Sequence, residues 1–141
     1  MNLDDIRIEI VRSWNTEEIV ALYRAGGWWQ DSFDPMEIPA LIKGSFAFAV
    51  AADSKSGQAV GMGRALSDGI SDAYIQDIVV IPKYRGKRLG TAIASKLIAR
   101  CRDAGITWIA LIAEPGTEKV YMPLGFTPME GYVPLIYRGE S

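Results

Sequence analysis

Short segments of alternating or continuous apolar residues recur along the chain and predict its strands. Residues 6–10 read Ile-Arg-Ile-Glu-Ile, which is the period-two pattern of a half-buried strand. The run 73–81 is instead apolar at most positions, which is typical of a strand buried on both faces. The predicted strands are 6–10, 46–52, 58–66, 73–81, 107–112, 126–129 and 132–137, the last two forming a closing hairpin through Glu130-Gly131.

Helical periodicity predicts about four helices between these strands. The longest begins at Gly90 and runs to about Ala104, and its apolar stripe includes Cys101. Of the other three, one begins after a cap at Asn15 or Thr16, one follows Asp34-Pro35 and extends to Leu41, and one occupies residues 115–124.

One strand–helix–strand unit sets the fold class. The strand at 73–81, the helix from Gly90 and the strand at 107–112 have the length of a right-handed parallel crossover. The strands at 46–52 and 58–66 are joined by a turn at 53–57 and should pair antiparallel, so the sheet is mixed and the class is α/β. With 141 residues, 49% of them hydrophobic, residues 1–141 are expected to form a single domain with its own core.

Composition removes several classes of chemistry. The chain has no histidine, which excludes Ser-His-Asp and Cys-His nucleophilic sites and histidine-ligated zinc. A single cysteine cannot form an internal disulfide or a thiolate cluster, so no metal is expected. No run of eighteen apolar residues occurs, and residues 1–10 lack the layout of a signal peptide. These features predict a cytoplasmic protein without a membrane partner.

Charge is distributed unevenly along the chain. Residues 83–102 hold seven cations and no acid, whereas the rest of the chain has 8 cations against 17 acids. One end of the site should therefore attract a polyanion and the remainder a cation. The low isoelectric point, near 5.2, argues against nucleic acid as a partner.

The cations are concentrated in a loop between the strand at 73–81 and the following helix. Arg85, Lys87 and Arg88 stand beside Gly86 and Gly90 there. The unpaired N–H groups and the dipole of a helix N-terminus attract anions. No GxxxxGK[ST] or GxGxxG pattern is present, so a nucleotide triphosphatase and a dinucleotide fold are not favoured. We expect a pyrophosphate-sized ligand.

This loop resembles the coenzyme A loop of the GCN5-related N-acetyltransferase (GNAT) superfamily. Its signature is Val-x-Pro-x-Tyr-Arg/Gln-Gly-x-Gly-x-Gly, and residues 80–90 read Val-Ile-Pro-Lys-Tyr-Arg-Gly-Lys-Arg-Leu-Gly. Arg88 departs from it, because it stands where the first core glycine of the family usually lies. A second motif, Val-Tyr-Met-Pro-Leu-Gly-Phe at 120–126, resembles the family's Phe-Tyr-x-x-Leu-Gly-Phe.

The resemblance implies a fold and a set of site residues. The fold would be a mixed, mostly antiparallel sheet of about seven strands, with a splayed parallel pair that holds acetyl-CoA and about four helices. Tyr121 would donate a proton to the coenzyme A thiolate, and Trp28, Trp29 and Gln76 would contact the acceptor. The residues expected at acetyl-CoA are Ile78, Val79, Val80, Ile81, Arg85, Gly86, Lys87, Arg88, Leu89, Gly90 and Thr91.

The general base is less clearly marked. Some members of the family carry Glu-Asp where this chain has Gln76-Asp77, and glutamine cannot accept a proton as a carboxylate does. Asp77 is the nearest ionisable candidate, alone or through water. Since alternate strand residues face opposite sides, only a bulge would let both Gln76 and Asp77 face the site.

The leading function is transfer of an acetyl group from acetyl-CoA to a small primary amine, in a ternary complex. The alternatives are a protein lysine or N-terminal acetyltransferase, and a catalytically silent module that binds acyl-CoA. The sequence leaves the acceptor, the acyl length and a homodimer open.

Overall fold

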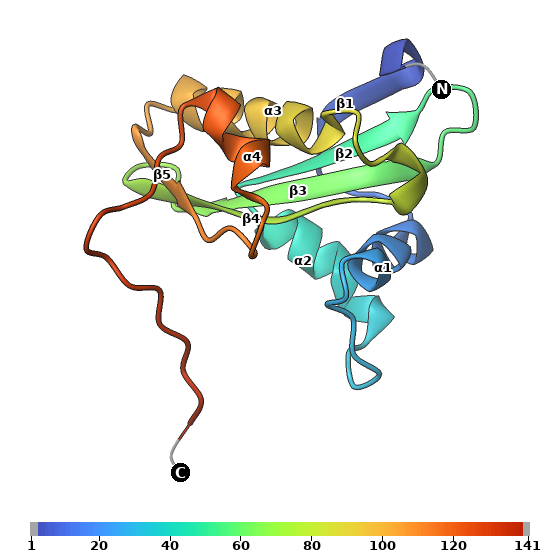
Figure 1. Cartoon of the computed structure of the whole chain (residues 1–141). Coiled ribbons are helices and arrows are strands. Elements are labelled where there is room, and N and C mark those ends of the chain that lie inside the picture. The colour runs from blue at the N-terminus through green and yellow to red at the C-terminus, as the bar shows by residue number, and fades with distance from the viewer. Residues whose placement is uncertain (1–2, 140–141) are drawn as a thin grey trace.

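The computed structural model describes residues 3–139. Within them the strands form one five-stranded sheet, in which they lie side by side in the order of the chain (Figure 1). The first four strands pair antiparallel, and the last two pair parallel. The strands are β1 (Ile6–Val11), β2 (Ala47–Asp53), β3 (Ala59–Ser67), β4 (Asp72–Val80) and β5 (Trp108–Leu111). The α/β class and the parallel pair predicted from the sequence are confirmed.

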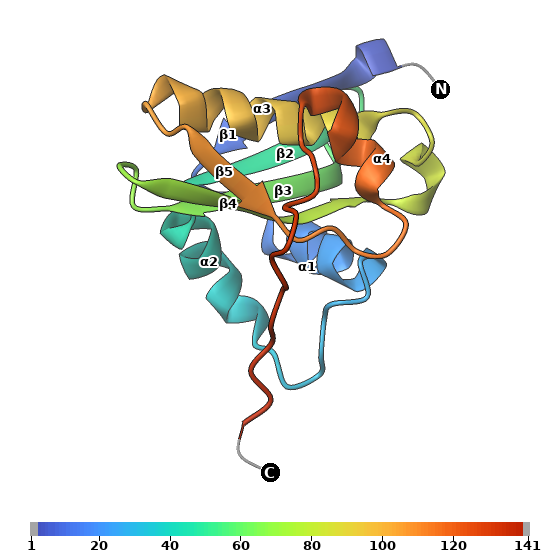
Figure 2. The ribbon, with the colours of Figure 1, turned by 60° about the vertical axis from the view of Figure 1, so that its left-hand side comes forward.

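Helices cover both faces of this sheet. α3 (Leu89–Asp103) lies across one face, while α1 (Thr16–Ala25) and α2 (Ile38–Gly44) lie against the other (Figures 1 and 2). α4 (Glu118–Tyr121) follows β5 and packs near the start of α3. These four α-helices of residues 3–139 match the predicted number. Short 3-10 turns occupy Leu3–Asp5, Pro35–Glu37, Pro82–Tyr84 and Met122–Leu124.

The sheet carries a separate apolar cluster on each face. α3 buries Ile93, Leu97 and Cys101 completely, so the predicted stripe and the core position of the cysteine are confirmed. β3 lies close to this helix because Gly61 and Gly63 of β3 have no side chain between the strand and the helix. A Cβ added to Gly61 would lie only 2.9 Å from the Cδ1 atom of Ile93. On the opposite face, Phe48 and the α1 and α2 side chains form the second cluster.

A β-bulge interrupts β4 in its middle. Met62 pairs with Val79 and Arg64 with Gln76, so two residues of β4 stand opposite one residue of β3. Asp77 lies in the bulge with a φ of 60°, the left-handed conformation that aspartate tolerates better than most residues. The bulge shifts the alternation of side chains at this point of the strand.

β4 and β5 separate soon after they pair. Their register runs from Asp72 opposite Trp108 to Ile75 opposite Leu111, where β5 ends. β4 continues to Val80, so its edge beyond Ile75 has no strand beside it on that side among the described residues. A wedge therefore opens between the second half of β4 and the segment that follows β5.

The predicted closing hairpin does not form, and the prediction of about seven strands was wrong. A turn does form at Glu130-Gly131, with the N–H of Tyr132 donating to the Met129 carbonyl at 3.2 Å and Gly131 at a φ of 79°. The positive φ at the third residue makes this a type II turn, which splays the strands on either side of it. The type I′ and II′ turns that are usual in hairpins instead match the right-handed twist of the strands. Pro134 also lacks the N–H that a hairpin would need opposite Thr127.

Among residues 3–139, no helix has the length and apolar character needed to cross a bilayer. The same residues contain no group of three or more acidic or cysteine side chains placed to hold a metal ion.

Candidate active site

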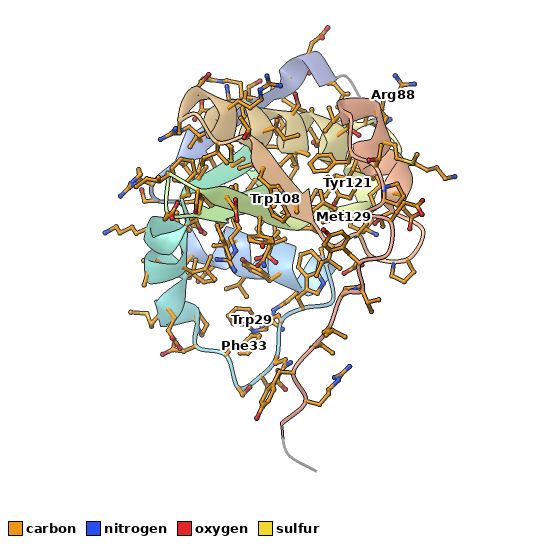
Figure 3. The ribbon with its side chains drawn as sticks, turned by 90° about the vertical axis from the view of Figure 1, so that its left-hand side faces the viewer. Trp29, Phe33, Arg88, Trp108, Tyr121 and Met129 are labelled. Carbon is orange, nitrogen blue, oxygen red and sulfur yellow. The ribbon has the colours of Figure 1, made fainter. Side chains whose placement is uncertain are left out.

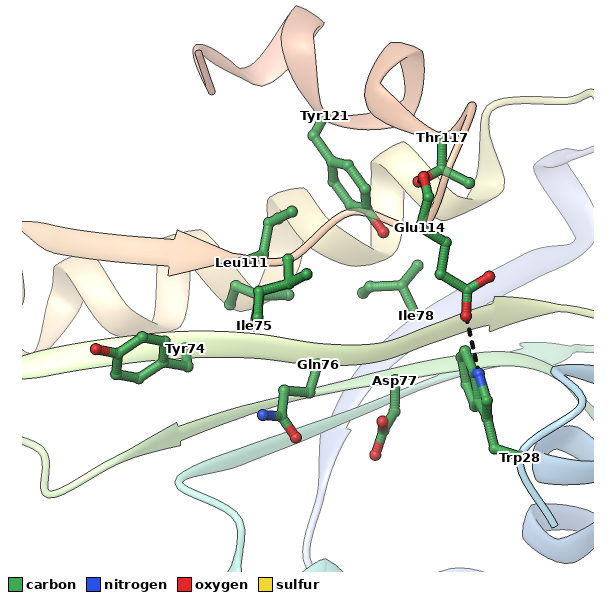
Figure 4. Close-up of a pocket in the computed structure, with 11 residues that line it drawn as sticks. Trp28, Tyr74, Ile75, Gln76, Asp77, Ile78, Leu111, Glu114, Thr117 and Tyr121 are labelled. Carbon is green, nitrogen blue, oxygen red and sulfur yellow. Dashed lines mark hydrogen bonds between the residues drawn. The ribbon is translucent and has the colours of Figure 1, made fainter. Parts of the chain in front are cut away.

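A cavity of about 280 Å³ occupies the wedge between β4 and the segment after β5 (Figure 4). Its floor is the bulged part of β4, and its far wall is formed by Glu114, Thr117 and Tyr121. Trp28, which follows α1, closes one end. The cavity therefore gathers side chains from three parts of the chain that are distant in sequence.

The bulge places two polar side chains of β4 on the same side. Gln76 and Asp77 both project from the strand toward the α1 face of the sheet (Figure 4). From the sequence, this arrangement was possible only if the strand contained a bulge. The structure has this bulge, with Asp77 in the left-handed conformation. Both predicted residues line the cavity.

Asp77 is held by two donors on one of its oxygens. Its Oδ2 atom accepts hydrogen bonds from the Tyr23 hydroxyl and from the Arg64 Nε, each at 2.8 Å. The side chains of Arg64 and Asp77 are only 18% and 22% exposed, so their ion pair is partly shielded from water. The Asp77 carboxylate is thus held in a fixed orientation at the floor of the cavity.

The same contact perturbs Tyr23. Burial first, and then the charge and hydrogen bond of Asp77, raise the pKa of Tyr23 far above its ordinary value. Tyr23 therefore keeps its proton and serves to orient Asp77.

This raised pKa gives a prediction for stability. Between the ordinary tyrosine pKa, near 10, and the higher folded value, the native state binds more protons than the unfolded state does. The contribution of Tyr23 to the free energy of unfolding should therefore be fully present below about pH 10 and be lost as the pH rises above it. Denaturant unfolding from pH 8 to 11 should show that the free energy of unfolding falls less with pH in Tyr23→Phe than in the wild type. Tyr132→Phe, which changes an exposed ring, is the control and should follow the wild type. A Tyr23→Phe curve parallel to the wild type would contradict the assignment.

Tyr121 forms the far wall of the cavity, above β4 (Figure 4). Its ring packs edge-on against Phe126, with centroids 6.1 Å apart. Thr91 of α3 supports this position, because its hydroxyl donates to the carbonyl of Val120 at 2.7 Å. Burial, and then the charge of Glu114, raise the pKa of Tyr121 above its ordinary 10.0. The phenol stays protonated at neutral pH and can donate.

Glu114 is a cavity residue that sequence reasoning missed. Its Oε1 atom accepts a hydrogen bond of 2.9 Å from the Trp28 indole, which ties the segment after β5 to the loop after α1 (Figure 4). Gly26 makes room for this indole, since a Cβ there would lie 2.7 Å from the Trp28 ring. The available signal was an acidic residue just after a buried strand, at the edge where the site was expected. Tyr23, Arg64, Tyr74 and Thr117 were missed as well.

The two adjacent tryptophans have different environments. Trp28 lines the cavity, as the sequence predicted for a residue that contacts the acceptor. Trp29 instead packs edge-on against Phe33, at 5.5 Å between centroids, and lies under the Arg24 guanidinium. Figure 3 shows Trp29 and Phe33 together on the loop after α1, away from Tyr121. The structure does not bring Trp29 into the cavity with the other predicted residues.

The basic loop runs from the end of β4 to α3. Arg88 caps α3 in the left-handed conformation, with a φ of 64° and a ψ of 20°. A glycine would adopt this conformation without strain, so Arg88 keeps the expected loop shape at a cost of roughly 1 kcal/mol. The N–H groups of Leu89, Gly90 and Thr91 at the start of the helix have no intrahelical acceptor.

Two motif side chains hold this loop in place. The Tyr84 hydroxyl donates to Asp53 at 3.0 Å. Arg85 donates from Nε to the Val80 carbonyl at 2.8 Å and from Nη2 to the Ala25 carbonyl at 3.3 Å. Lys87 and Arg88 make no salt bridge with any residue in the range 3–139. Their charges remain available to an anion.

The β4 backbone beside the wedge also has N–H groups, and their directions differ from one residue to the next. The N–H of Ile81 donates to the Val60 carbonyl of β3 at 2.9 Å, so it is already used. Since successive strand residues direct their hydrogen-bonding groups to opposite edges, the N–H of Val80 points toward the wedge. The pyrophosphate-sized ligand expected from the sequence at the start of α3 stays a prediction.

Most of the chain matches one protein family. The model of the acetyltransferase (GNAT) family matches residues 8–126. The chain belongs to the GNAT family of N-acetyltransferases. The motifs at residues 80–90 and 120–126 lie inside the matched region.

Individual GNAT relatives agree with this assignment. An uncharacterized N-acetyltransferase, ycf52, of Porphyra purpurea is 29% identical over 126 residues, which cover 89% of this chain and 72% of that protein. Serotonin N-acetyltransferase 2 of Oryza sativa is 41% identical over 75 residues, but these cover only 53% of this chain and 38% of that protein.

Solved GNAT structures share the fold. A GNAT acetyltransferase of Streptococcus pneumoniae superposes with a TM-score of 0.79 at 21% identity, covering 96% of this chain and 99% of that chain. The structure of AAC(6')-Iy in complex with the bisubstrate analogue CoA-S-monomethyl-acetylneamine superposes with a TM-score of 0.72 at 18% identity, covering 96% of this chain and 99% of that chain.

Proposed function

We propose that this GNAT protein transfers an acetyl group from acetyl-CoA to the primary amine of a small molecule with an aromatic or apolar body. One observation carries the proposal. The cavity holds a proton-donating phenol, Tyr121, on its far wall and two carboxylates, Asp77 and Glu114, around the space in front of it.

The residues divide the chemistry between them. The amine nitrogen attacks the thioester carbonyl carbon, and negative charge develops on the carbonyl oxygen, for which the Val80 N–H is our proposed donor. The C–S bond then breaks, and the thiolate takes the proton of Tyr121. The carboxylates of Asp77 and Glu114 attract the ammonium form of the acceptor.

Glu114 is our proposed acceptor of the amine's proton, directly or through water. Asp77, the base expected from the sequence, shares Oδ2 with a guanidinium and a phenol. Glu114 instead receives a single indole hydrogen bond, lies in an exposed segment and faces Tyr121 closely enough to affect its pKa. In this arrangement Asp77 orients the ammonium and Glu114 removes the proton.

The anion loop would hold the pyrophosphate of acetyl-CoA. Arg85 is tied to backbone carbonyls, so Lys87 gives the cleaner test of this role. Lys87→Glu should weaken acetyl-CoA binding about tenfold at low salt and less at high salt, because exposed charges are screened. Calorimetric titration at two salt concentrations measures this. Lys96→Glu, an equal charge change on the exposed face of α3, is the matched control and should bind normally. A loss that is independent of salt would instead indicate a misfolded loop.

The size and lining of the cavity favour a small acceptor with an apolar part. Its volume, about 280 Å³, is at the low end of small-molecule sites. Trp28 offers a ring surface beside Glu114, and Tyr74 offers another at the opposite end of the cavity (Figure 4), which suits a cation on an aromatic or apolar body. The rice relative is named for serotonin, an amine of this kind.

An amine panel tests the function. Release of coenzyme A thiol would be followed with arylalkylamines, polyamines, amino sugars and lysine peptides, after acetyl-CoA binding has been confirmed by titration. We expect the arylalkylamines to give the highest kcat/KM. Binding of acetyl-CoA without amine-dependent thiol release would favour the silent module, to which Gln76 in place of a glutamate points.

A protein acceptor is the second candidate. A Glycine max relative named histone acetyltransferase TAP1 is 40% identical over 67 residues, covering 48% of this chain and 29% of that protein. Higher kcat/KM for lysine peptides than for free amines in the same panel would favour this reading.

The names of relatives also bear on location. The rice protein and two GNAT relatives from Arabidopsis thaliana are named as chloroplastic. This similarity favours a plastid over the general cytoplasm expected from the sequence, and imaging of a fluorescent fusion in the source organism would test it.

A further inference from the structure

The cavity between β4 and the segment after β5 has carboxylates in its lining but no cation. Among the described residues that line it, none is a lysine or an arginine, and the two carboxylates are Asp77 and Glu114. The other polar groups of the lining are an amide, an indole and hydroxyls. An ammonium ion suits such a site, whereas an anionic group on the same acceptor would find no cationic side chain in the lining to pair with it.

One cation does reach a carboxylate of the cavity, and it is already engaged there. Arg64 of β3 does not line the cavity, and its Nε donates to the Asp77 Oδ2 at 2.8 Å. The guanidinium side chain is only 18% exposed, so it is largely covered as well as paired. Arg64 therefore offsets the charge of Asp77 and is not free to bind a second carboxylate.

Glu114 has no such partner. It forms no salt bridge with any residue in the range 3–139, and its Oε1 accepts one hydrogen bond from the Trp28 indole, at 2.9 Å. Its charge acts inside the cavity, because it raises the pKa of Tyr121 there, after burial. The carboxylate of Glu114 is therefore the uncompensated charge of the site.

We infer that the cavity is a charge filter, which admits amines that have no neighbouring carboxylate and rejects free α-amino acids. The filter rests on the proposed function, because it concerns the acceptor of that reaction. In an α-amino acid the carboxyl carbon is two bonds from the nitrogen, about 2.5 Å away. Once the ammonium pairs with Glu114, the carboxylate of the acceptor lies within about 6 Å of the Glu114 oxygens.

Two physical effects then act against the amino acid. Repulsion between two carboxylates at this distance, in a partly exposed site, weakens binding about tenfold. The carboxylate also loses part of its hydration without gaining a cationic partner, which adds about another tenfold. Together they favour an amine over its parent amino acid by about a hundredfold.

The filter places the protein after a decarboxylation. In that reaction the bond between the α-carbon and the carboxyl carbon of an amino acid breaks, CO₂ leaves, and a proton takes its place on the α-carbon. The nitrogen and the aromatic or apolar side chain are kept. A decarboxylation thus converts an amino acid that the cavity rejects into an amine that it admits.

Three ligands that differ only at the α-carbon test the filter by binding alone. Phenethylamine has hydrogen there, phenylalaninamide has a neutral group of carboxylate size, and phenylalanine has the carboxylate. Each is titrated by calorimetry into the full chain saturated with coenzyme A, at about pH 6, where an α-amino group is an ammonium. We expect the first two to bind within about tenfold of each other and phenylalanine to bind about a hundredfold more weakly than phenethylamine.

The outcomes separate the filter from the proposed reaction. Equal binding of phenylalanine and phenylalaninamide would overturn the filter. Binding of both that is much weaker than that of phenethylamine would also overturn it, because exclusion would then follow size and not charge. The expected order of binding without amine-dependent release of thiol from acetyl-CoA would overturn the reaction and leave the filter standing. No binding of any of the three would overturn both.

Variants assign the filter to particular side chains. Glu114→Gln should reduce the preference for phenylalaninamide over phenylalanine about tenfold, since only the repulsion is lost. The preference is a ratio of two affinities, so a loss of catalysis in this variant does not affect it. Gln76→Lys, which adds a cation to the cavity floor, should strengthen the binding of phenylalanine. Glu118→Gln removes an exposed carboxylate of α4 that does not line the cavity, and it should leave the preference unchanged. A preference that neither Glu114→Gln nor Gln76→Lys alters would overturn the filter.

Discussion

Replacing Tyr121 with phenylalanine is expected to lower kcat by about 10² to 10³, with little change in acetyl-CoA affinity. The substitution removes the hydroxyl that would protonate the departing thiolate, while the ring keeps its contact with Phe126. Steady-state kinetics with the best amine of the panel, together with calorimetric titration of acetyl-CoA, measures the two effects separately. Equal losses in kcat and in affinity would remove Tyr121 from the acid role.

A matched control lies in the same cavity. Tyr74→Phe also removes a hydroxyl from the lining, but Tyr74 packs edge-on against Trp108 at 5.5 Å and has no proposed part in proton transfer. We expect its kcat to stay within about twofold of the wild type, well short of the loss assigned to a proton donor. A similar loss in both variants would mean that the cavity needs polarity in general and not one acid.

Glu114→Gln is expected to lower kcat/KM for the amine by about 10² and to leave acetyl-CoA binding unchanged. Glutamine keeps an oxygen that can accept the Trp28 indole hydrogen, so the loop contact survives while the charge is lost. The substitution removes both an attraction for the ammonium and our proposed proton acceptor. Initial rates at varied amine concentration, at saturating acetyl-CoA, give the ratio.

The same variant should change the pH profile. The charge of Glu114 helps to raise the pKa of Tyr121, after burial. Without it, the pKa of Tyr121 should fall, and the alkaline loss of kcat should begin at a lower pH than in the wild type. An unchanged alkaline limb would show that another group sets it.

Asp77→Asn separates the two carboxylates. It leaves the Arg64 guanidinium without its partner, so the main expected effect is a loss of about 1–3 kcal/mol in the free energy of unfolding. Should Asp77→Asn abolish amine turnover in a stable protein while Glu114→Gln does not, the base would be Asp77, as first expected from the sequence.

The parts of this site that depend on local sequence were predictable. The strand that becomes β4, the basic loop and the start of α3 were located to within one or two residues, because apolar runs, glycine turns and helix caps act over a few neighbouring positions. Tyr121 was proposed on a different ground, the resemblance of the motif at residues 120–126 to a family signature. Trp28 was proposed for the acceptor side from its place after a helix stop.

The sequence alone therefore determined the α/β class and the positions in the chain of the basic loop and of Tyr121, the candidate acid. Tertiary structure decided the rest, because those features depend on which distant segments pack together. Asp77 faces the cavity only because pairing with β3 forces a bulge, and Glu114 meets Trp28 across 86 positions of sequence. The last two predicted strands have strand-like composition, yet they stay unpaired: a strand needs hydrogen-bonding partners outside its own segment, and the turn at Gly131 does not bring them together.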